Sequence, residues 1–391
     1  MGELNDIAKK YAQNNPIRFH MPGHKGRLKN ELNCSLDLTE LFFTDNLYAP
    51  SGEINLIYAL EERISKCFFK NANVYSLISC TGATLCVQAS VLALKTSKLK
   101  QNRGELYIIC DRASHVSFVN TISLLGLSPL WIYPGEDFPE MIARLAQRQN
   151  PENIAGVYVT SPDYYGQMKD IEKISKECKK YSLDLVVDNS HGSHLAFHNG
   201  GSLHPKNLGA DISIDSVHKT LPVLTGAALL FADGKFDKEK ITRPAMKMFA
   251  TTSPSYLILQ SIEAMVDMLE FCGVTEHERL LFDIESFKRK AAELGFVFYG
   301  VEFSDPYRIV LNCENSGEKL YYFLAQKNIF CEFFDNDCVV ALTSISNCAD
   351  DFKTLFEASK EFAKDNKIIH AKQKKIVYPP GVPDIIPGGY V

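Results

Sequence analysis

Short apolar runs alternate with helix-length stretches through the middle of this chain. The apolar runs fall at residues 106–110, 130–133, 156–160, 183–188, 211–215 and 227–231. Each run has the length of a buried strand, and the spacers between them are long enough to contain helices. Strands that are separated by helices pair in parallel, because the chain has to cross back over the sheet. The pattern therefore predicts an α/β fold with a predominantly parallel, doubly wound sheet.

The two ends of the chain differ from this central pattern. Residues 1–50 contain a polar helix candidate and a breaker-rich loop at 19–26, and we interpret them as an N-terminal arm. Residues 51–255 form the predicted large domain, and residues 256–391 a smaller α+β domain that begins with a linking helix. The smaller domain contains strand-like and helical segments at 297–299, 308–312, 339–343 and 352–362.

Composition is that of an ordinary globular protein. Of 391 residues, 46% are hydrophobic and 23% are charged, and the formal net charge is −5. This charge gives no overall attraction for nucleic acid, and no apolar segment approaches the roughly 18 residues that a membrane span needs. The eleven cysteines contain no Cys-x-x-Cys pair, so reduced thiols are expected rather than disulfides. We expect a soluble, cytoplasmic protein without an export signal.

Polar residues at the carboxyl ends of the predicted strands are the candidates for chemistry, because ligands bind there in sheets of this type. Asp111, Ser161, Asp188 and Lys219 all follow such strands. A lysine at the mouth of a sheet, with an aspartate one strand upstream, is what pyridoxal phosphate (PLP) chemistry requires. Lys219 would hold the cofactor as an imine, and Asp188 would keep the ring nitrogen protonated. Taken singly, Lys219 fits a surface lysine, and Asp188 fits a turn or cap residue equally well.

Other residues near predicted strand ends fit the same cofactor. His115 follows the strand at 106–110, where its imidazole could stack on the cofactor ring and supply a proton. Thr81, Gly82 and Ala83 precede a helix-like stretch, whose first N–H groups could bind the phosphate. Ordinary helix capping is the alternative for the hydroxyls, and a lone loop histidine is more often structural.

Hydroxyl groups supply the remaining candidates for phosphate binding. Ser216 and His218 lie on either side of the turn that carries Lys219, where they could bind the phosphate or position the imine. A second cluster begins a predicted helix and fits either phosphate binding or capping: Thr251, Thr252 and Ser253.

The histidines of the loop at 19–26 do not predict a metal site. His20 and His24 have the i, i+4 spacing of helical zinc ligands. Pro22 and Gly23 lie between them and exclude a regular helix, so the spacing does not place both imidazoles on one face.

Several of these motifs together resemble the bacterial ornithine/lysine/arginine decarboxylase family, which consists of PLP-dependent enzymes with the aspartate aminotransferase fold (fold type I). The resemblance covers most of the chain. Its most specific parts are Phe-His-Met-Pro-Gly-His-Lys-Gly at 19–26 and the lysine motif at 216–224. Further matching segments lie at 45–47, 111–115, 160–166, 188–192, 251–256 and 379–383.

The resemblance implies a role for each candidate. It makes Lys219 the Schiff-base lysine, Asp188 the partner of the pyridinium and His115 the ring-stacking residue. It places further residues around the cofactor: Thr81, Gly82, Ala83, His191, Ser216 and His218. The hydroxyls at 251–253 would reach the phosphate of a neighbouring subunit, which implies an obligate homodimer with shared active sites. The implied reaction releases CO2 from lysine, arginine or ornithine and leaves a polyamine or a polyamine precursor.

The chain departs from the family pattern at several positions. Asn189 and Ser190 stand where the family usually has Glu-Ala, and the phosphate loop reads Ser-Cys-Thr-Gly at 79–82 in place of Asn-Gly-Ser-Thr. Family members commonly continue past the proline-rich end and carry a glutamate where this chain has Gly389. If that glutamate recognises the distal cation of the substrate, we expect an altered specificity here.

Two other classes of function stay open from the sequence. An aminotransferase or carbon–sulfur lyase can use the same fold, and a catalytically inactive relative can serve as an interaction protein. An aminotransferase typically clamps the substrate α-carboxylate with arginine, and Arg308 is the residue to examine for that role. Retention of Lys219, Asp188 and His115 together argues against an inactive protein.

Overall fold

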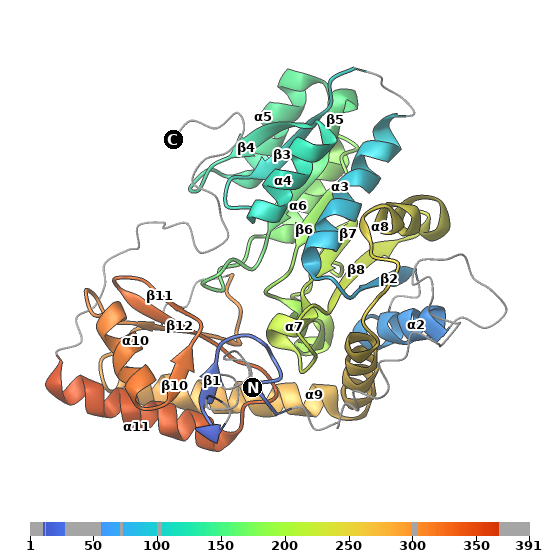
Figure 1. The fold of residues 1–391 in the computed structure, drawn as a ribbon. Helices are drawn as coiled ribbons and strands as arrows, with labels where there is room; N and C mark the ends of the chain where they lie inside the picture. Colours follow the sequence, from blue (N-terminus) through green and yellow to red (C-terminus); the bar gives the residue numbers. More distant parts are fainter. Residues whose placement is uncertain are drawn as a thin grey trace.

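A seven-stranded sheet forms the centre of the larger lobe (Figure 1). The structure is a computed structural model, and it describes residues 11, 13–27, 56–70, 73–99, 104–298 and 303–366. The strand order is β2-β8-β7-β6-β5-β3-β4. The strands are β2 Val74–Ser79, β3 Tyr107–Asp111, β4 Ser128–Ile132, β5 Ile154–Thr160, β6 Leu185–Asp188, β7 Ile212–Asp215 and β8 Ala228–Asp233. Strands β3 to β7 pair in parallel, and β8 runs antiparallel between β7 and β2. The predicted, mostly parallel α/β sheet is confirmed.

Helices cover both faces of this sheet, as a doubly wound fold requires. Alternate strand residues point to opposite faces, so Ile108 and Cys110 belong to one apolar cluster and Ile109 to another. The first cluster includes helices α3 (Ala83–Leu99) and α4 (Val116–Leu125), and the second includes α5 (Phe138–Gln149) and α6 (Ile171–Lys180). Because both faces are buried, the strands carry continuous apolar runs, and this explains why the sequence pattern was informative.

The smaller lobe is built on a three-stranded antiparallel sheet with the order β11-β12-β9. Its elements are β9 Arg308–Asn312, α10 Gly317–Gln326, β10 Ile329–Cys331, β11 Phe333–Phe334, β12 Cys338–Leu342 and α11 Ala349–Asp365. Strand β1 (Ile17–Phe19), from the predicted N-terminal arm, pairs in parallel with β10 and so packs with this lobe. The predicted strand at 297–299 is reduced to one bridge between Val297 and Asn312 within the described residues.

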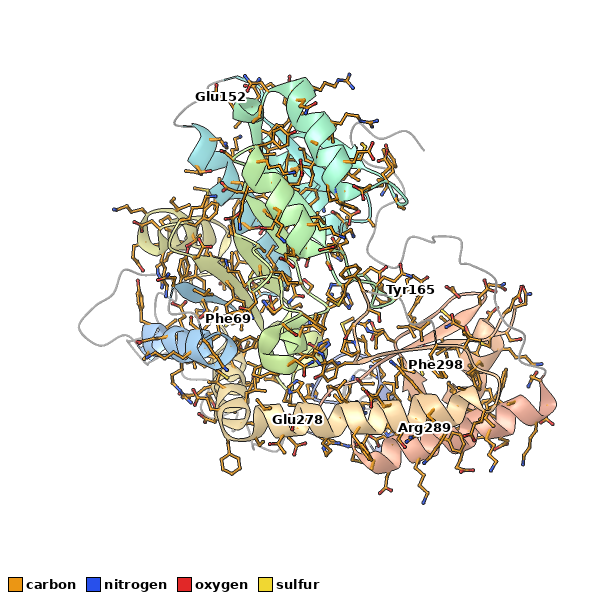
Figure 2. The ribbon with its side chains drawn as sticks, turned by 180° about the vertical axis from the view of Figure 1, so that it is seen from behind. Phe69, Glu152, Tyr165, Glu278, Arg289 and Phe298 are labelled. Carbon is orange, nitrogen blue, oxygen red and sulfur yellow. The ribbon has the colours of Figure 1, made fainter. Side chains whose placement is uncertain are left out.

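A long helix, α9 (Tyr256–Ala292), runs from the larger lobe along the smaller one. Figure 2 shows it from behind, with Glu278 and Arg289 along its length. Shorter helices complete the fold: α2 Leu56–Phe68, α7 Val217–Thr220 and α8 Arg243–Phe249. The division of the chain at 50/51 and 255/256 stays a prediction. The motif at 45–47, the proline-rich end and Gly389 lie outside the described residues.

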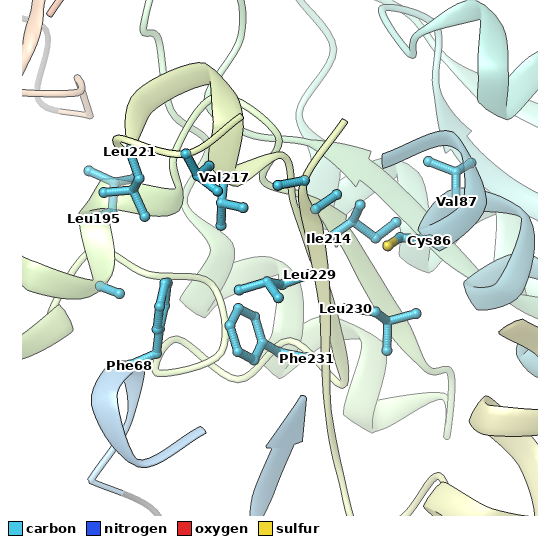
Figure 3. Close-up of a cluster of buried hydrophobic side chains, with 14 of the residues drawn as sticks. Phe68, Cys86, Val87, Leu195, Ile214, Val217, Leu221, Leu229, Leu230 and Phe231 are labelled. Atoms are coloured by element: carbon cyan, nitrogen blue, oxygen red, sulfur yellow. The ribbon is translucent and has the colours of Figure 1, made fainter. Parts of the chain in front are cut away.

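Apolar packing fixes the short helix α7, which carries Lys219 (Figure 3). Val217 and Leu221 are completely buried on either side of Lys219. They belong to the same cluster as Phe68 and Phe231, whose ring centroids lie 5.1 Å apart. A four-residue helix has little stability of its own, so its position depends on these contacts. The core thus fixes the backbone from which Lys219 projects.

None of the helices in the described residues combines the length and the apolar character that a membrane span needs. Within the same residues, no group of three or more His, Cys, Asp and Glu side chains is arranged to hold a metal ion. The described cysteines are free thiols, and most are buried.

Candidate active site

Lys219 and His191 are in direct contact at the carboxyl edge of the sheet. Lys219 Nζ lies 3.0 Å from His191 Nε2. Burial lowers the pKa of Lys219, the positive charge of Arg308 lowers it further, and the charges of Asp188 and Glu332 oppose this shift. The neutral amine is the nucleophilic form of lysine, so the environment favours the reactive state.

His191 is a neutral hydrogen-bond partner for this lysine. Burial lowers its pKa well below the ordinary value, and the charges of Lys219 and Arg308 add to that effect. A neutral His191 can accept a hydrogen bond at Nε2 from Lys219, which places its own proton on Nδ1. Nδ1 is buried and has no hydrogen-bond partner among the described residues. The ring is also in edge contact with Tyr164, with centroids 5.1 Å apart.

Asp188 ends strand β6 with both carboxylate oxygens anchored. Tyr158 donates its hydroxyl proton to Oδ2 at 3.0 Å. Ser190 donates to Oδ1 from its backbone N–H at 3.1 Å and from its hydroxyl at 2.5 Å. The departure from the family pattern at Ser190 therefore adds a donor to this carboxylate. Asn189 points elsewhere and donates to Asp215 at 2.9 Å, so its role is structural.

His115 caps helix α4 and lies close enough to Lys219 and Asp188 for their charges to act on it. Its Nδ1 accepts a hydrogen bond from the Ser117 backbone N–H at 3.1 Å. Burial lowers the pKa of His115, while the charge of Asp188 raises it and that of Lys219 lowers it again. Capping and a role in the site are therefore compatible, because the cap uses one ring nitrogen. The structure brings His115, Asp188, His191 and Lys219 together.

The loop before α3 is already hydrogen-bonded within the chain. The Gly82 N–H donates to the Gly226 carbonyl at 2.7 Å, and the Thr81 N–H donates to the Ser79 hydroxyl at 3.2 Å. Gly82 has a φ of +82°, and a Cβ added there would meet nothing within 4 Å. The first N–H groups of a helix have no intrahelical partner, so the N–H groups of Ala83 and Thr84 and the hydroxyls of the exposed Thr81 and Thr84 are donors that this loop can offer to a phosphate.

Ser216 and His218 lie at the start of the turn that carries Lys219, and their predicted role toward a phosphate stays a prediction. The Ser216 carbonyl accepts the Lys219 backbone N–H at 2.9 Å. His218 Nδ1 lies 2.9 Å from the Ala227 carbonyl, which can only accept, so the proton of a neutral His218 sits on Nδ1. Burial lowers the pKa of His218. A neutral His218 would offer only an acceptor at Nε2, so it would have to be protonated to bind phosphate through that atom.

The hydroxyl cluster at 251–253 does not cap helix α9. Ser255 is the N-cap, and its hydroxyl accepts the Ile258 N–H at 3.5 Å. Thr251, Thr252 and Ser253 are exposed, and the Ser253 N–H donates to the Thr251 hydroxyl at 3.1 Å. No contact in the described part of the chain joins them to Lys219. A role toward a second subunit stays a prediction.

The loop at 19–26 packs directly on the lysine turn, which the sequence did not indicate. The Gly23 N–H donates to the His218 carbonyl at 2.7 Å. A Cβ at Gly23 would lie 2.4 Å from the Leu221 carbonyl oxygen, so only glycine allows this approach. The Ser344 hydroxyl in turn donates to the Gly23 carbonyl, which joins the loop to the smaller lobe.

Glu332 is a site residue that sequence analysis missed. Its carboxylate accepts the Met21 N–H at 2.7 Å and the Tyr164 hydroxyl at 2.6 Å, and its charge acts on Lys219. Glu332 follows β10 in the smaller lobe, and no local pattern marks it. Only the docking of that lobe and of the loop at 19–26 brings it to the site.

Arg308 is bound to backbone carbonyls of the loops that surround the site. Its guanidinium donates to the Tyr164 carbonyl at 2.8 Å and to the His191 carbonyl at 3.4 Å. It also lies 3.6 Å from Asp305, and its side chain is only 2% exposed. Arg308 therefore holds the loop that carries His191.

Lys25 provides a test of the loop's burial. Its ammonium donates to the His20 and Leu342 carbonyls at 2.7 and 2.9 Å, and burial lowers its pKa to about 7. The unfolded chain therefore binds one proton more between pH 7 and the ordinary pKa of 10.5, and stability rises with pH in that window. In the wild type, this proton difference raises the free energy of unfolding by about 2 kcal/mol between pH 7 and pH 9. We expect the Lys25→Met variant to lack this rise when urea unfolding is measured at the two pH values.

The matched control for Lys25 is Lys173→Met, at a lysine side chain that is 71% exposed. This control should keep the pH dependence of the wild type. An unchanged slope in Lys25→Met would contradict the burial of this ammonium.

Comparison with solved structures defines the class of protein. The structure of the constitutive lysine decarboxylase of E. coli superposes with a TM-score of 0.65 at 17% identity, over 79% of this chain and 51% of that chain. A structure of SPT with a PLP internal aldimine gives a TM-score of 0.62 at 13% identity, over 79% of this chain and 77% of that chain. The fold is therefore that of the fold type I PLP-dependent enzymes, and the predicted fold class is confirmed. This chain spans about half of the lysine decarboxylase structure.

The family follows from sequence comparison. A family model for the major domain of the Orn/Lys/Arg decarboxylases matches residues 4–295, and this chain belongs to that family. An arginine decarboxylase of Bacillus subtilis (strain 168) is 25% identical over 97% of this chain and 89% of its own length. The constitutive lysine decarboxylase of Escherichia coli (strain K12) is 25% identical over 41% of this chain and 25% of its own length. The chain is thus an enzyme of the amino-acid decarboxylase class, as predicted.

Proposed function

We propose that this protein is a PLP-dependent decarboxylase of a basic amino acid, either lysine, arginine or ornithine. The observation that carries the proposal is the contact of 3.0 Å between Lys219 Nζ and the buried His191, beside the anchored carboxylate of Asp188. The arginine and lysine decarboxylases among its relatives support the substrate class. We further infer that the product is a polyamine or a polyamine precursor.

The residues present fit PLP by their chemistry. Lys219 offers a desolvated amine, and Asp188 offers a fixed negative charge. The open space at Gly82 and the exposed Thr81 hydroxyl at the start of α3 suit a phosphate. When bound, the cofactor supplies an electron sink for the electrons of the broken carbon–carbon bond. Lys219, Asp188 and the start of α3 would hold it, with His115 over the ring.

Proton movement in the proposed reaction falls to the two histidines and the lysine. His191 would accept a hydrogen bond from Lys219 Nζ and keep that amine oriented, while burial lowers the pKa of Lys219 and favours its neutral form. His115, which has a free Nε2 once its Nδ1 caps α4, could deliver a proton to the substrate Cα after CO2 departs. Lys219 is the second candidate donor for that proton.

The position of Arg308 favours decarboxylation over transamination. A clamp on the α-carboxylate would hold the group that a decarboxylase has to release. Arg308 already donates to two carbonyls, lies near Asp305 and is almost completely buried. We infer that it positions His191 and does not bind the substrate carboxylate.

The assembly is proposed as a homodimer with shared active sites. Its support is the exposed hydroxyl cluster at 251–253. These hydroxyls do not cap α9, because Ser255 is the N-cap of that helix. The free, mostly buried thiols support a cytoplasmic location, where thiols stay reduced.

A product assay tests the proposed reaction. The protein with added PLP is incubated with lysine, arginine and ornithine, and the CO2, amine and keto acid formed are quantified. We expect CO2 and the corresponding amine in equal amounts from at least one of the three. Keto acid without CO2 would instead indicate an aminotransferase, and no product from any of them would overturn the proposal.

A further inference from the structure

Tyr158 is a completely buried residue of strand β5 that contacts two parts of the candidate site. In the sheet register, Tyr158 pairs with Val186, and Asp188 follows two residues later on β6. Alternate residues of a strand point to opposite faces, so Tyr158 and Asp188 lie on the same face of the sheet. The Tyr158 hydroxyl donates to Asp188 Oδ2 at 3.0 Å. Burial and the charge of Asp188 raise the pKa of Tyr158 well above the ordinary value, so its hydroxyl remains a donor.

The hydrogen bonds to Asp188 from the described residues leave its carboxylate one acceptor position. A carboxylate has about four such positions, two on each oxygen. The N–H and the hydroxyl of Ser190 both donate to Oδ1, and Tyr158 donates to Oδ2. The position that is left is therefore on Oδ2, the oxygen that Tyr158 holds. Because both oxygens are anchored, the carboxylate cannot rotate freely, and Tyr158 fixes the direction from which Asp188 accepts a further donor.

The ring of Tyr158 contacts the helix that begins after His115. It stacks on Phe118 of α4, with the ring centroids 3.9 Å apart and 19° between the ring planes. The Phe118 N–H donates to the His115 carbonyl at 2.9 Å, in the first turn of that helix. Phe118 is also completely buried, so the stack cannot shift without disturbing the packed core. One side chain thus joins Asp188 to the helical turn that holds His115.

We propose that Tyr158 is a positioning residue that holds Asp188 and His115 in a fixed relation, so that both act on the same PLP ring. This inference rests on the proposed use of PLP, in which Asp188 pairs with the ring nitrogen and His115 lies over the ring. The single acceptor position left on Asp188 matches the one N–H group of a protonated pyridine nitrogen. Tyr158 acts through its two neighbours and not by contact with the cofactor or the substrate.

Tyr158→Phe tests the hydroxyl alone, because phenylalanine keeps the ring that stacks on Phe118. Binding of PLP is measured by equilibrium dialysis, which does not depend on turnover. We expect the dissociation constant for PLP to rise about tenfold, because the carboxylate that pairs with the ring nitrogen loses one of its anchors. The visible circular dichroism per bound PLP should also fall, because the ring is held less firmly in one orientation.

Tyr75→Phe is the matched control for a purely structural effect. The Tyr75 hydroxyl is partly buried on β2 of the same sheet and lies 2.8 Å from the Thr242 hydroxyl. Its removal should lower the melting temperature and leave the dissociation constant for PLP at the wild-type value. Equal affinities for PLP in Tyr158→Phe and Tyr75→Phe would overturn the proposal.

A double substitution tests whether Tyr158 acts through Asp188. In the Asp188→Asn background the charge is absent, so adding Tyr158→Phe should change the dissociation constant for PLP less than about twofold. A further tenfold rise in that background would show a separate effect and overturn the proposal.

Phe118→Leu tests the second contact of Tyr158, because it removes the stacked ring and keeps the hydroxyl. It should lower the visible circular dichroism per bound PLP, and an unchanged signal would overturn the link to His115. If the wild type binds no PLP, the proposed function fails together with this inference. If the wild type binds PLP and Tyr158→Phe binds it equally well, only this inference fails.

Discussion

Lys219→Ala is expected to abolish CO2 release from every basic amino acid, by about 10³-fold or more. No other described lysine contacts His191, so no other amine is placed to take over. The variant should also fail to retain PLP after borohydride reduction, whereas reduced wild type should carry it on the peptide that contains Lys219. Mass spectrometry of the digested protein measures this directly, independently of activity.

Two controls separate chemistry from folding in this experiment. Lys219→Arg keeps a positive charge, but a guanidinium stays protonated and cannot act as the amine, so it should be as inactive as Lys219→Ala. Lys173→Ala, at an exposed position of α6, should behave as wild type. Activity of Lys219→Ala within tenfold of wild type would contradict the proposed site.

Asp188→Asn is expected to lower the rate of CO2 release about a hundredfold and to weaken the binding of PLP. The reason is that the proposed charge-assisted hydrogen bond from the ring nitrogen of PLP to Asp188 would contribute about 1.5–3 kcal/mol. Asparagine has nearly the same shape, but only its single oxygen can accept, so it would keep the hydrogen bonds from Ser190 or the one from Tyr158, and it would lose the negative charge. Turnover under saturating PLP and equilibrium dialysis with PLP measure the two effects.

Ser190→Ala is the matched control for Asp188→Asn. It removes one donor to the carboxylate and restores the alanine that the family usually has, but it keeps the charge. We expect a loss of less than tenfold. Equal losses in the two variants would show that hydrogen bonding at Asp188, and not its charge, supports the reaction.

The strands of the large sheet were readable because they are buried on both faces. Strand β2 was not predicted, since Ser76 and Ser79 interrupt its apolar run. In the folded protein both serine hydroxyls donate to backbone carbonyls, Ser76 to Glu61 at 2.6 Å and Ser79 to Gly82 at 2.8 Å. The length of helix α9, which runs to Ala292, was not readable from the sequence, because Gly273 and His277 are buried on its inner face without an apolar signature.

Some residues of the candidate site could also be recognised from the sequence, and others could not. Lys219, Asp188 and His115 could be singled out as candidates from the sequence, because each lies close to the end of a recognisable strand. Glu332 and the loop at 19–26 could not be placed, because they reach Lys219 only after the smaller lobe docks. Arg308 was noticed as a possible carboxylate clamp, and its contacts with the Tyr164 and His191 carbonyls give it a positioning role instead.

By itself, the sequence determined the α/β class, most of the strands, the family resemblance and the lysine–aspartate pair at the strand ends. These are properties of periodicity and of residues next to one another, and such local signals persist in the linear chain. The tertiary structure decided that His191 meets Lys219, that β1 pairs with β10, and that Glu332 and Arg308 close around the site. Such contacts join residues far apart in the chain, and they depend on how buried surfaces pack, which no local pattern specifies.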